Sequence, residues 1–188
     1  MISSLKKIVV ATAAASSLLA TAANAADIYQ GGVAVPSATG VTFYGSGIQL
    51  TKGSINLSCN VSLTGDISPD GSGGADIEVT TGSVSGGGLC GFVNLLNFPW
   101  TAHVDAADAP VPPENTQVPV TFSGITVDAY FLGTCGPDSV TAMYNNGASV
   151  PNTDASSFTF ATTIDPDCSI TGTLSTQMPY STEDVDVY

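Results

Sequence analysis

A strict alternation of apolar and polar residues over positions 55–64 is the most regular pattern in the chain. The apolar positions are Ile55, Leu57, Cys59, Val61 and Leu63. Because successive side chains of a strand point to opposite faces, this period of two predicts a strand with one buried face. The glycine-rich stretch near position 70 predicts a turn, and the apolar residues that alternate after it predict a hairpin partner.

The same period recurs along the rest of the chain. Further strands are predicted around Val41 and Phe43, over 118–131, around Val140 and Ala142, around Phe158 and Phe160, and over 168–174. Gly124 interrupts the second of these and predicts a β-bulge, and Asn145-Asn146-Gly147 predicts a hairpin turn. No helical period follows residue 25, and 20 glycines and 11 prolines separate the strands. The chain is therefore expected to be all-β, as an antiparallel sandwich or a partly open barrel.

Residues 1–25 have the three parts of a secretory signal peptide. Lys6 and Lys7 precede an apolar stretch over 8–20, and Ala23-Asn24-Ala25 is a small-x-small cleavage site. The apolar stretch is shorter than the roughly 20 residues that cross a bilayer as a helix. We expect a helical signal peptide over 1–25, then one all-β domain over 26–188 with its core at about 40–175. The expected location is secreted, reached through the periplasm, with no transmembrane segment in the mature chain.

The charge of the chain excludes one class of partner. Sixteen acidic residues face three lysines and no arginine, and removal of the leader lysines takes the formal net charge from −13 to −15. A nucleic-acid binder needs a basic face to neutralise phosphates, and Lys52 alone cannot form one. Nucleic acid is therefore not expected as a partner.

The four cysteines predict two structural disulfides. They are Cys59, Cys90, Cys135 and Cys168, widely spaced, with no C-x-x-C pair. Three pairings exist, and the sequential one, 59–90 with 135–168, is favoured because it closes each half of the chain internally. This usage fits an oxidising compartment.

Residues suited to catalysis or metal binding are scarce. His103 is the one histidine that could serve as a base, and no nucleophile motif or phosphate loop is present. Asp66, Ser68, Asp70 and Gly71 resemble the start of a calcium loop, but Ile77 stands where the loop needs a bidentate Glu. A hairpin turn is the better interpretation. The expectation is a protein with no catalytic residues, no metal and no cofactor.

The densest apolar stretch spans residues 92–100. Two interpretations are open: core strands kinked at Pro99, or an exposed patch that contacts another chain or an oily surface. The chain ends also hold alternating residues, which would allow self-association by strand addition. The candidate patch residues are Phe92, Leu95, Leu96, Phe98 and Trp100.

Four blocks in order resemble a known family. They are Leu50–Cys59 with Leu63-Thr64-Gly65; Gly88-Leu89-Cys90 with Phe98-Pro99-Trp100; Leu132–Pro137 with Asn145-Asn146-Gly147; and Asp167–Leu174. Together they are similar to the protein activator of alkane oxidation family (PraA/PraB type), small secreted bacterial proteins. The resemblance covers residues 40–175 and implies a non-enzymatic factor that aids hydrocarbon use, through emulsification or the cell surface. It implies no catalytic residues.

The leading expectation is therefore a factor that acts at oil–water or cell-surface interfaces. Its partners would be hydrocarbon or cell-surface material. The alternative is an extracellular matrix or fibre subunit that self-associates through a terminal strand.

Overall fold

The computed structural model describes residues 26–108, 117–130, 132–147, 154–165, 167–176 and 184–188. The predicted signal peptide and most of the proline-rich stretch at 109–119 lie outside the described residues. The strands are β1 (Ile28–Gln30), β2 (Val33–Val35), β3 (Ala38–Lys52), β4 (Ile55–Pro69), β5 (Ala75–Ser85), β6 (Val93–Leu96), β7 (Trp100–Val104), β8 (Val118–Ala129), β9 (Gly133–Asn145), β10 (Ser157–Thr163), β11 (Cys168–Thr176) and β12 (Val185–Val187). One short 3-10 helix, η1 (Gly88–Phe92), precedes β6.

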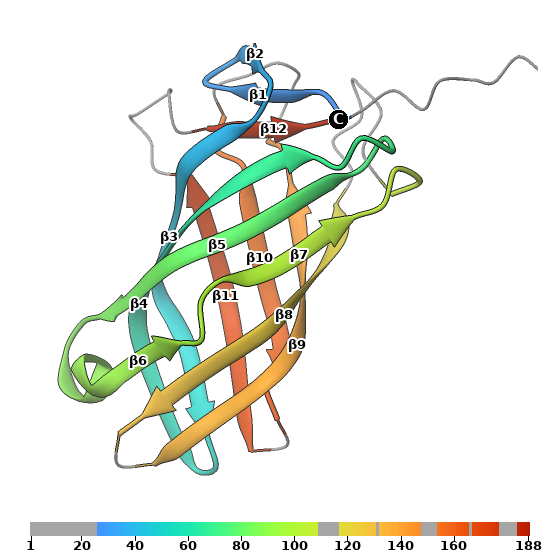
Figure 1. The fold of residues 1–188 in the computed structure, drawn as a ribbon. Helices are drawn as coiled ribbons and strands as arrows, with labels where there is room; N and C mark the ends of the chain where they lie inside the picture. The colour runs from blue at the N-terminus through green and yellow to red at the C-terminus, as the bar shows by residue number, and fades with distance from the viewer. Residues whose placement is uncertain (1–25, 109–116, 131, 148–153, 166, 177–183) are drawn as a thin grey trace, which may run out of the picture.

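Eight antiparallel strands close into a barrel, seen in Figure 1. Their order is β7-β5-β4-β3-β11-β10-β9-β8, and the ring closes because β8 pairs with β9 on one edge and β7 on the other. The prediction of an all-β fold is confirmed. Of the two architectures left open, the structure has the barrel, and the barrel is closed.

The predicted hairpin and bulge are both present. β4 pairs with β5 across the turn near position 70, with Ile67 opposite Ile77. The β8–β9 register shifts between Phe122 and Ile125, where Gly124 has a φ of +80°. The shift lets Phe122 and Ile125 both face the interior, because the extra residue restores the alternation after the bulge.

The alternating apolar residues fill the barrel. Phe122 contacts Phe158 edge-on, with ring centroids 5.3 Å apart, and Phe158 lies 4.9 Å from both Phe43 and Tyr144. An eight-stranded barrel is just wide enough for side chains to fill it. The most deeply buried large side chains of the barrel wall are Val41, Ile48, Val120, Val140 and Leu174.

A small sheet in the order β12-β1-β2 covers one end of the barrel. The first and last strands, β1 and β12, therefore pair with each other, with Ile28 opposite Val187. β12 is buried, and Asn146 fixes it through two bonds: Nδ2 donates to Val187 O at 2.8 Å, and Val187 N donates to Oδ1 at 2.9 Å. Tyr144 donates its hydroxyl to Val185 O at 2.5 Å.

The hairpin turn predicted at Asn145-Asn146-Gly147 begins there, where Gly147 N donates to Asn145 Oδ1 at 2.8 Å, but it extends beyond these three residues. β9 and β10 pair as antiparallel neighbours with Asn145 opposite Ser157, so more residues separate the two strands than a tight turn would need. Asn146 leaves the hairpin because its amide bonds the backbone of β12. Local turn chemistry could not reveal this, since the partner lies 41 residues further along the chain.

Each disulfide spans a place where the strand pairing stops. Cys59–Cys90 ties β4 to η1, and no pairing joins β5 to β6 in the part of the chain that the structure describes. Cys135–Cys168 ties β9 to β11 beyond Phe160, where the β9–β10 pairing ends. The sequential pairing is the one that the structure contains. The bonds therefore hold the wall together where hydrogen bonds do not.

Candidate functional site

The apolar stretch at 92–100 divides between the interior and the surface. Trp100 is 3% exposed and lies inside the barrel, where its Nε1–H donates to Leu96 O at 2.8 Å. Phe98 is half-buried and stacks on Trp100, with ring centroids 4.6 Å apart. Leu95 is also half-buried against the core. These three candidate residues thus face inward and pack with the core.

The kink at 97–99 lets β6 and β7 follow the same edge of β8. Leu96 pairs opposite Thr126 and Thr101 opposite Ser123, so both strands lie on one side of β8. Asn97 takes a φ of +60° between them, and its Nδ2 donates to Thr126 Oγ1 at 3.0 Å. Asn tolerates this left-handed conformation better than most residues.

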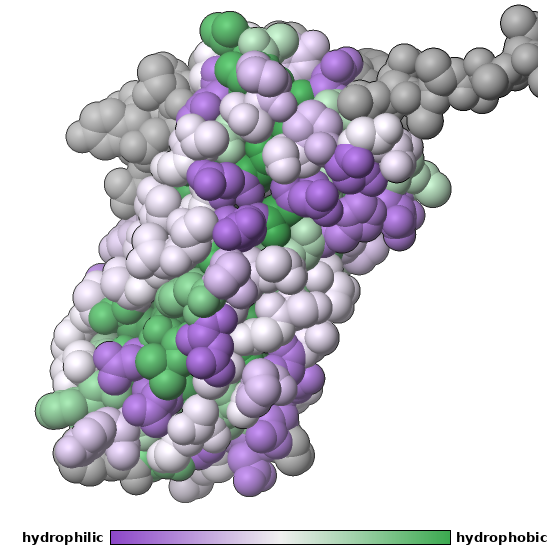
Figure 2. All heavy atoms as spheres, in the orientation of Figure 1, coloured by the Kyte–Doolittle hydropathy of each residue, from purple (hydrophilic) through white to green (hydrophobic). Residues whose placement is uncertain are grey.

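Phe92 and Leu96 point outward and form part of an exposed apolar surface. Their exposed fractions are 48% and 40%, and Leu89 in η1 and Tyr130 after β8 add 43% and 68%. Tyr130 N donates to Phe92 O at 3.2 Å, which places the end of β8 beside η1. Figure 2 shows hydrophobic atoms gathered over this part of the molecule. We call Leu89, Phe92, Leu96 and Tyr130 the apolar face.

The Cys59–Cys90 disulfide positions the apolar face on the barrel wall. Cys90 is buried, and its partner Cys59 lies in the first half of β4. η1 begins after Gly87 with no side-chain cap, so this five-residue helix has little stability of its own. The covalent bond therefore orients the segment that carries Leu89 and Phe92.

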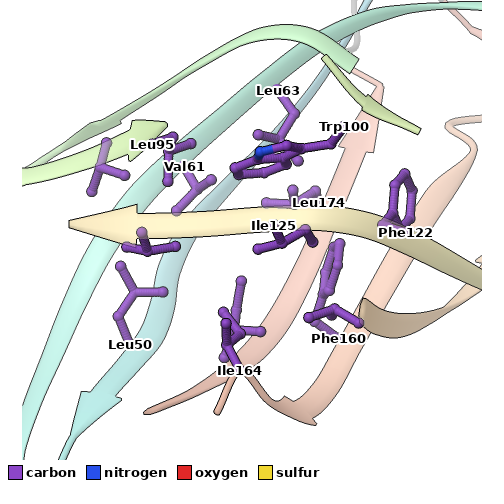
Figure 3. A pocket seen from close by; sticks show the side chains of 14 residues that line it. Leu50, Val61, Leu63, Leu95, Trp100, Phe122, Ile125, Phe160, Ile164 and Leu174 are labelled. Atoms are coloured by element: carbon purple, nitrogen blue, oxygen red, sulfur yellow. The ribbon is translucent and has the colours of Figure 1, made fainter. Parts of the chain in front are cut away.

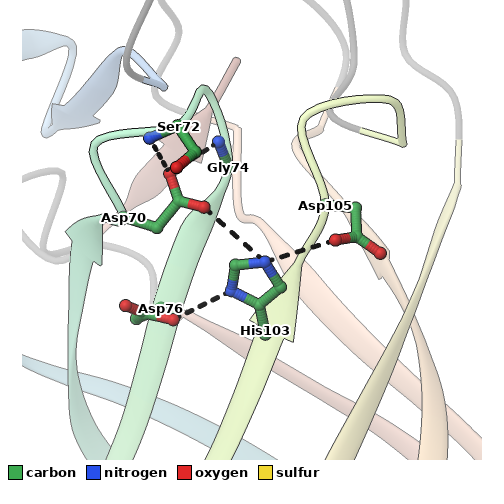
Figure 4. Close-up of polar contacts among 6 residues, drawn as sticks. All are labelled: Asp70, Ser72, Gly74, Asp76, His103 and Asp105. Carbon is green, nitrogen blue, oxygen red and sulfur yellow. Dashed lines mark hydrogen bonds and ion pairs between the residues drawn. The ribbon is translucent and has the colours of Figure 1, made fainter.

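His103 lies among three carboxylates near the other end of the barrel (Figure 4). Its Nδ1 is 2.9 Å from Asp76 Oδ1, and its Nε2 is 3.6 Å from Asp70 Oδ2 and 3.4 Å from Asp105 Oδ1. The hydrogen bond to Asp76, with the charges of all three carboxylates, raises the pKa of His103. The imidazole side chain is 44% exposed. The neighbouring carboxylates therefore favour the protonated form of the imidazole.

The calcium-loop resemblance resolves into a turn. Asp70 Oδ1 accepts backbone N–H bonds from Ser72 at 2.6 Å and Gly74 at 2.9 Å, which lower the pKa of Asp70. Asp66 Oδ1 accepts the N–H of Gly40 at 2.8 Å. Both carboxylates thus serve the backbone. Among the described residues, no group of three or more His, Cys, Asp or Glu side chains is arranged to hold a metal ion.

Sequence reasoning missed Leu89, Tyr130 and Lys52. Leu89 and Tyr130 join the apolar face because η1 and the end of β8 meet there, and this depends on strand order. Lys52 did carry a signal, since it is the one basic residue after the leader apart from His103. It lies half-buried at the end of β3, at the end of the barrel away from the small sheet.

The location of the protein follows in part from its covalent structure. Both disulfides indicate an oxidising compartment outside the cytoplasm. A search for membrane-spanning helices among the described residues found none that is long and apolar enough.

The chain was compared with known proteins at three levels. No curated protein and no solved structure matches it. A family model described as "Alkane oxidation protein activator PraA/PraB-like" matches residues 2–182. The match spans nearly the whole chain and includes both disulfides and the apolar face, so the chain belongs to the PraA/PraB-like alkane oxidation protein activator family.

Proposed function

We propose that this protein is a secreted, non-enzymatic factor that aids alkane utilisation by adsorbing at oil–water or cell-surface interfaces through the apolar face. The family description is that of an activator rather than a catalyst. The observation that carries the proposal is the exposure of Leu89, Phe92, Leu96 and Tyr130 together on η1, β6 and the end of β8. An exposed apolar cluster of this kind is typical of an interaction surface.

The apolar face is large enough to hold the protein at an oil surface. Its two leucines and Phe92 expose roughly 250 Å² of side chain, worth on the order of 6 kcal/mol on transfer to oil before ordering costs. The rest of the mature chain carries one lysine against 16 acids. A coated droplet would therefore present a negative, hydrated layer, whose repulsion is screened over about 8 Å at physiological salt.

The test measures hexadecane–water interfacial tension and emulsion lifetime with purified protein. The wild-type protein is expected to lower the tension, and the double variant Phe92→Ser, Leu96→Ser is expected to lose most of this effect. Val33→Ser is the matched control, because Val33 is 65% exposed on β2 at the opposite end of the barrel. Phe98→Ser is unsuitable, since Phe98 stacks on the buried Trp100.

Two results would contradict the proposal. One is an unchanged tension with the wild-type protein. The other is an equal loss of activity in Val33→Ser, which would mean that exposed apolar residues act without regard to place. Circular dichroism of each variant establishes that its fold is intact.

The fibre-subunit alternative receives no support from the terminal strands. β1 and β12 pair with each other in the same chain, and β12 is buried. Strand exchange with a neighbour would have to break the two Asn146–Val187 bonds. A concentration-dependent polymer of the purified protein would reverse this preference.

A further inference from the structure

A file of small apolar cavities runs through the barrel from the small sheet to the opposite end. Their volumes, in that order, are about 10, 20, 30 and 30 Å³. Each cavity shares lining side chains with the next, so only side chains separate them. The shared residues are Ile67 and Ile77 for the first pair, Leu63, Phe122 and Phe160 for the second, and Leu50, Val127 and Ile164 for the third.

The third cavity, which we call the central cavity, has a wholly apolar lining (Figure 3). Trp100, Ile125 and Leu174 are among the side chains that surround it. Apolar cavities stay dry and take up apolar guests, and eight-stranded barrels are known to hold one small ligand. With volumes of about 10 to 30 Å³, the cavities are too small to hold an alkyl chain as they stand, so the shared side chains must change rotamer for one to enter.

The last cavity, which we call the mouth cavity, lies at the end of the barrel away from the small sheet. Lys52 is the one charged residue in its lining, beside Leu50, Ile55 and Leu132. Lys52 Nζ donates to Thr134 O at 3.1 Å and lies 3.5 and 3.6 Å from the sulfurs of Cys168 and Cys135. No carboxylate lies within ion-pair distance of this ammonium among the described residues.

The position of Lys52 is unusual in so acidic a protein. Asp165 and Asp167 are exposed on the nearby β10–β11 turn, but neither lines the mouth cavity. A half-buried ammonium without a carboxylate partner favours an anionic ligand, because pairing with one offsets the cost of removing the charge from water. The cavity file behind it favours an alkyl chain.

We propose that the barrel binds a long-chain fatty acid, with its alkyl chain in the cavity file and its carboxylate on Lys52. Chemically, a fatty acid is the oxidised form of the alkane that the family description mentions. This binding site is separate from the apolar face, and the inference does not depend on interfacial activity.

Trp100 provides the probe, because it is the single tryptophan of the chain and lines the central cavity. Dodecanoic acid with bromine on its terminal carbon, kept below its micelle concentration, should quench Trp100 fluorescence saturably. Lys52→Met should weaken its binding about tenfold, the usual scale of one charge-assisted contact. Lys52→Arg should restore it. The corresponding bromoalcohol should bind wild type and Lys52→Met equally.

Val127→Phe tests the route into the barrel, since Val127 lines both the mouth cavity and the central cavity. This variant should lose quenching by the acid and the alcohol while still lowering interfacial tension. The variant with Phe92→Ser and Leu96→Ser should keep the quenching by both ligands and lose most of its effect on interfacial tension. Absence of saturable quenching in the wild-type protein, or equal affinity of Lys52→Met and wild type for the acid, would overturn the inference. If Val127→Phe does not fold, the quenching of wild-type Trp100 and the affinity of Lys52→Met for the acid still decide the question.

Discussion

His103 shows how the pKa of a single residue can be raised by neighbours that strand pairing brings to it. The three aspartates around it come from the β4–β5 turn, from β5 and from the residue after β7. Strand pairing brings them together, with Asp76 directly opposite His103. The cluster is therefore a consequence of how β5 pairs with β7.

The raised pKa of His103 predicts a pH-dependent contribution to stability. A histidine whose pKa is raised in the folded state stabilises that state. The stabilisation is fully present below the unfolded-state pKa of about 6.5 and is lost as the pH rises through the folded-state pKa. The Tm of the wild-type protein should exceed that of His103→Gln by more at about pH 5.5 than at pH 8.5. Added salt should reduce the difference, because the side chain is exposed. An identical difference at both pH values would contradict this assignment.

Asp184 also makes the folded state relatively more stable at low pH, but the cause is burial and not a charged neighbour. Burial raises its pKa, although Ser156 N and Thr176 Oγ1 donate to its Oδ1 at 2.8 and 3.0 Å. Since the folded state holds the proton more tightly than the unfolded state, stability rises as pH falls through the folded pKa. Asp184→Asn keeps an acceptor for both donors and should remove this component of the pH dependence. Thermal melts of both proteins between about pH 4.5 and 7.5 measure it, and parallel curves would refute it.

The disulfides act at the scale of elements, each at a gap in the strand pairing. Cys59–Cys90 fixes η1 and β6, and Cys135–Cys168 fixes the start of β9 against β11. Each closes a loop of about 30 residues, for which a stabilisation of about 2–4 kcal/mol is typical. The local stability of the barrel wall near each gap therefore depends on the disulfide that spans it.

Removal of each disulfide should loosen a different part of the barrel. In Cys59→Ala, Cys90→Ala, amide hydrogen exchange should accelerate mainly over 88–96, because η1 has no other strong anchor. In the double variant with Cys135→Ala and Cys168→Ala, amide hydrogen exchange should accelerate mainly over 133–139 and 164–170. Each variant is the control for the other. Uniform acceleration across the chain in both would show that the bonds act on global stability only.

At the scale of the whole molecule, the barrel has two different ends. One is covered by the small sheet and lies near the His103 cluster, since Val104 and Val187 line the same cavity. The other carries Lys52 at its mouth, with the hairpin turns of the barrel around it. The acidic residues give the whole a net charge of −13.

The net charge predicts a nonspecific response to salt. Screening of self-repulsion should raise Tm as ionic strength increases. Calcium should raise it no more than magnesium at equal ionic strength, because Asp66 and Asp70 already accept backbone N–H groups. A rise specific to calcium in a thermal melt would reveal a cation site that the turn geometry does not suggest.

The sequence by itself determined the strands and the covalent framework. The alternation at 55–64 predicted β4, Gly124 predicted a bulge, and four spaced cysteines predicted two disulfides. The side-chain period of two and the positive φ are local properties that depend on neighbouring residues only, and the two disulfides follow from the number of cysteines and the expected compartment. Burial within the pattern was less uniform than expected. Cys59 and Val61 are buried, but Ile55 is 36% exposed because it lies at the barrel mouth.

Only the tertiary structure decided closure, exposure and the candidate sites. The same alternation suits a sandwich and a barrel, and the choice depends on how β8 pairs with β7 and β9. The apolar face requires η1 to meet the end of β8, and the mouth cavity requires Lys52 on β3 to face β9 and β11. These contacts join residues up to 116 positions apart. A one-dimensional pattern carries no information about them, because they arise from strand order and register across the whole sheet.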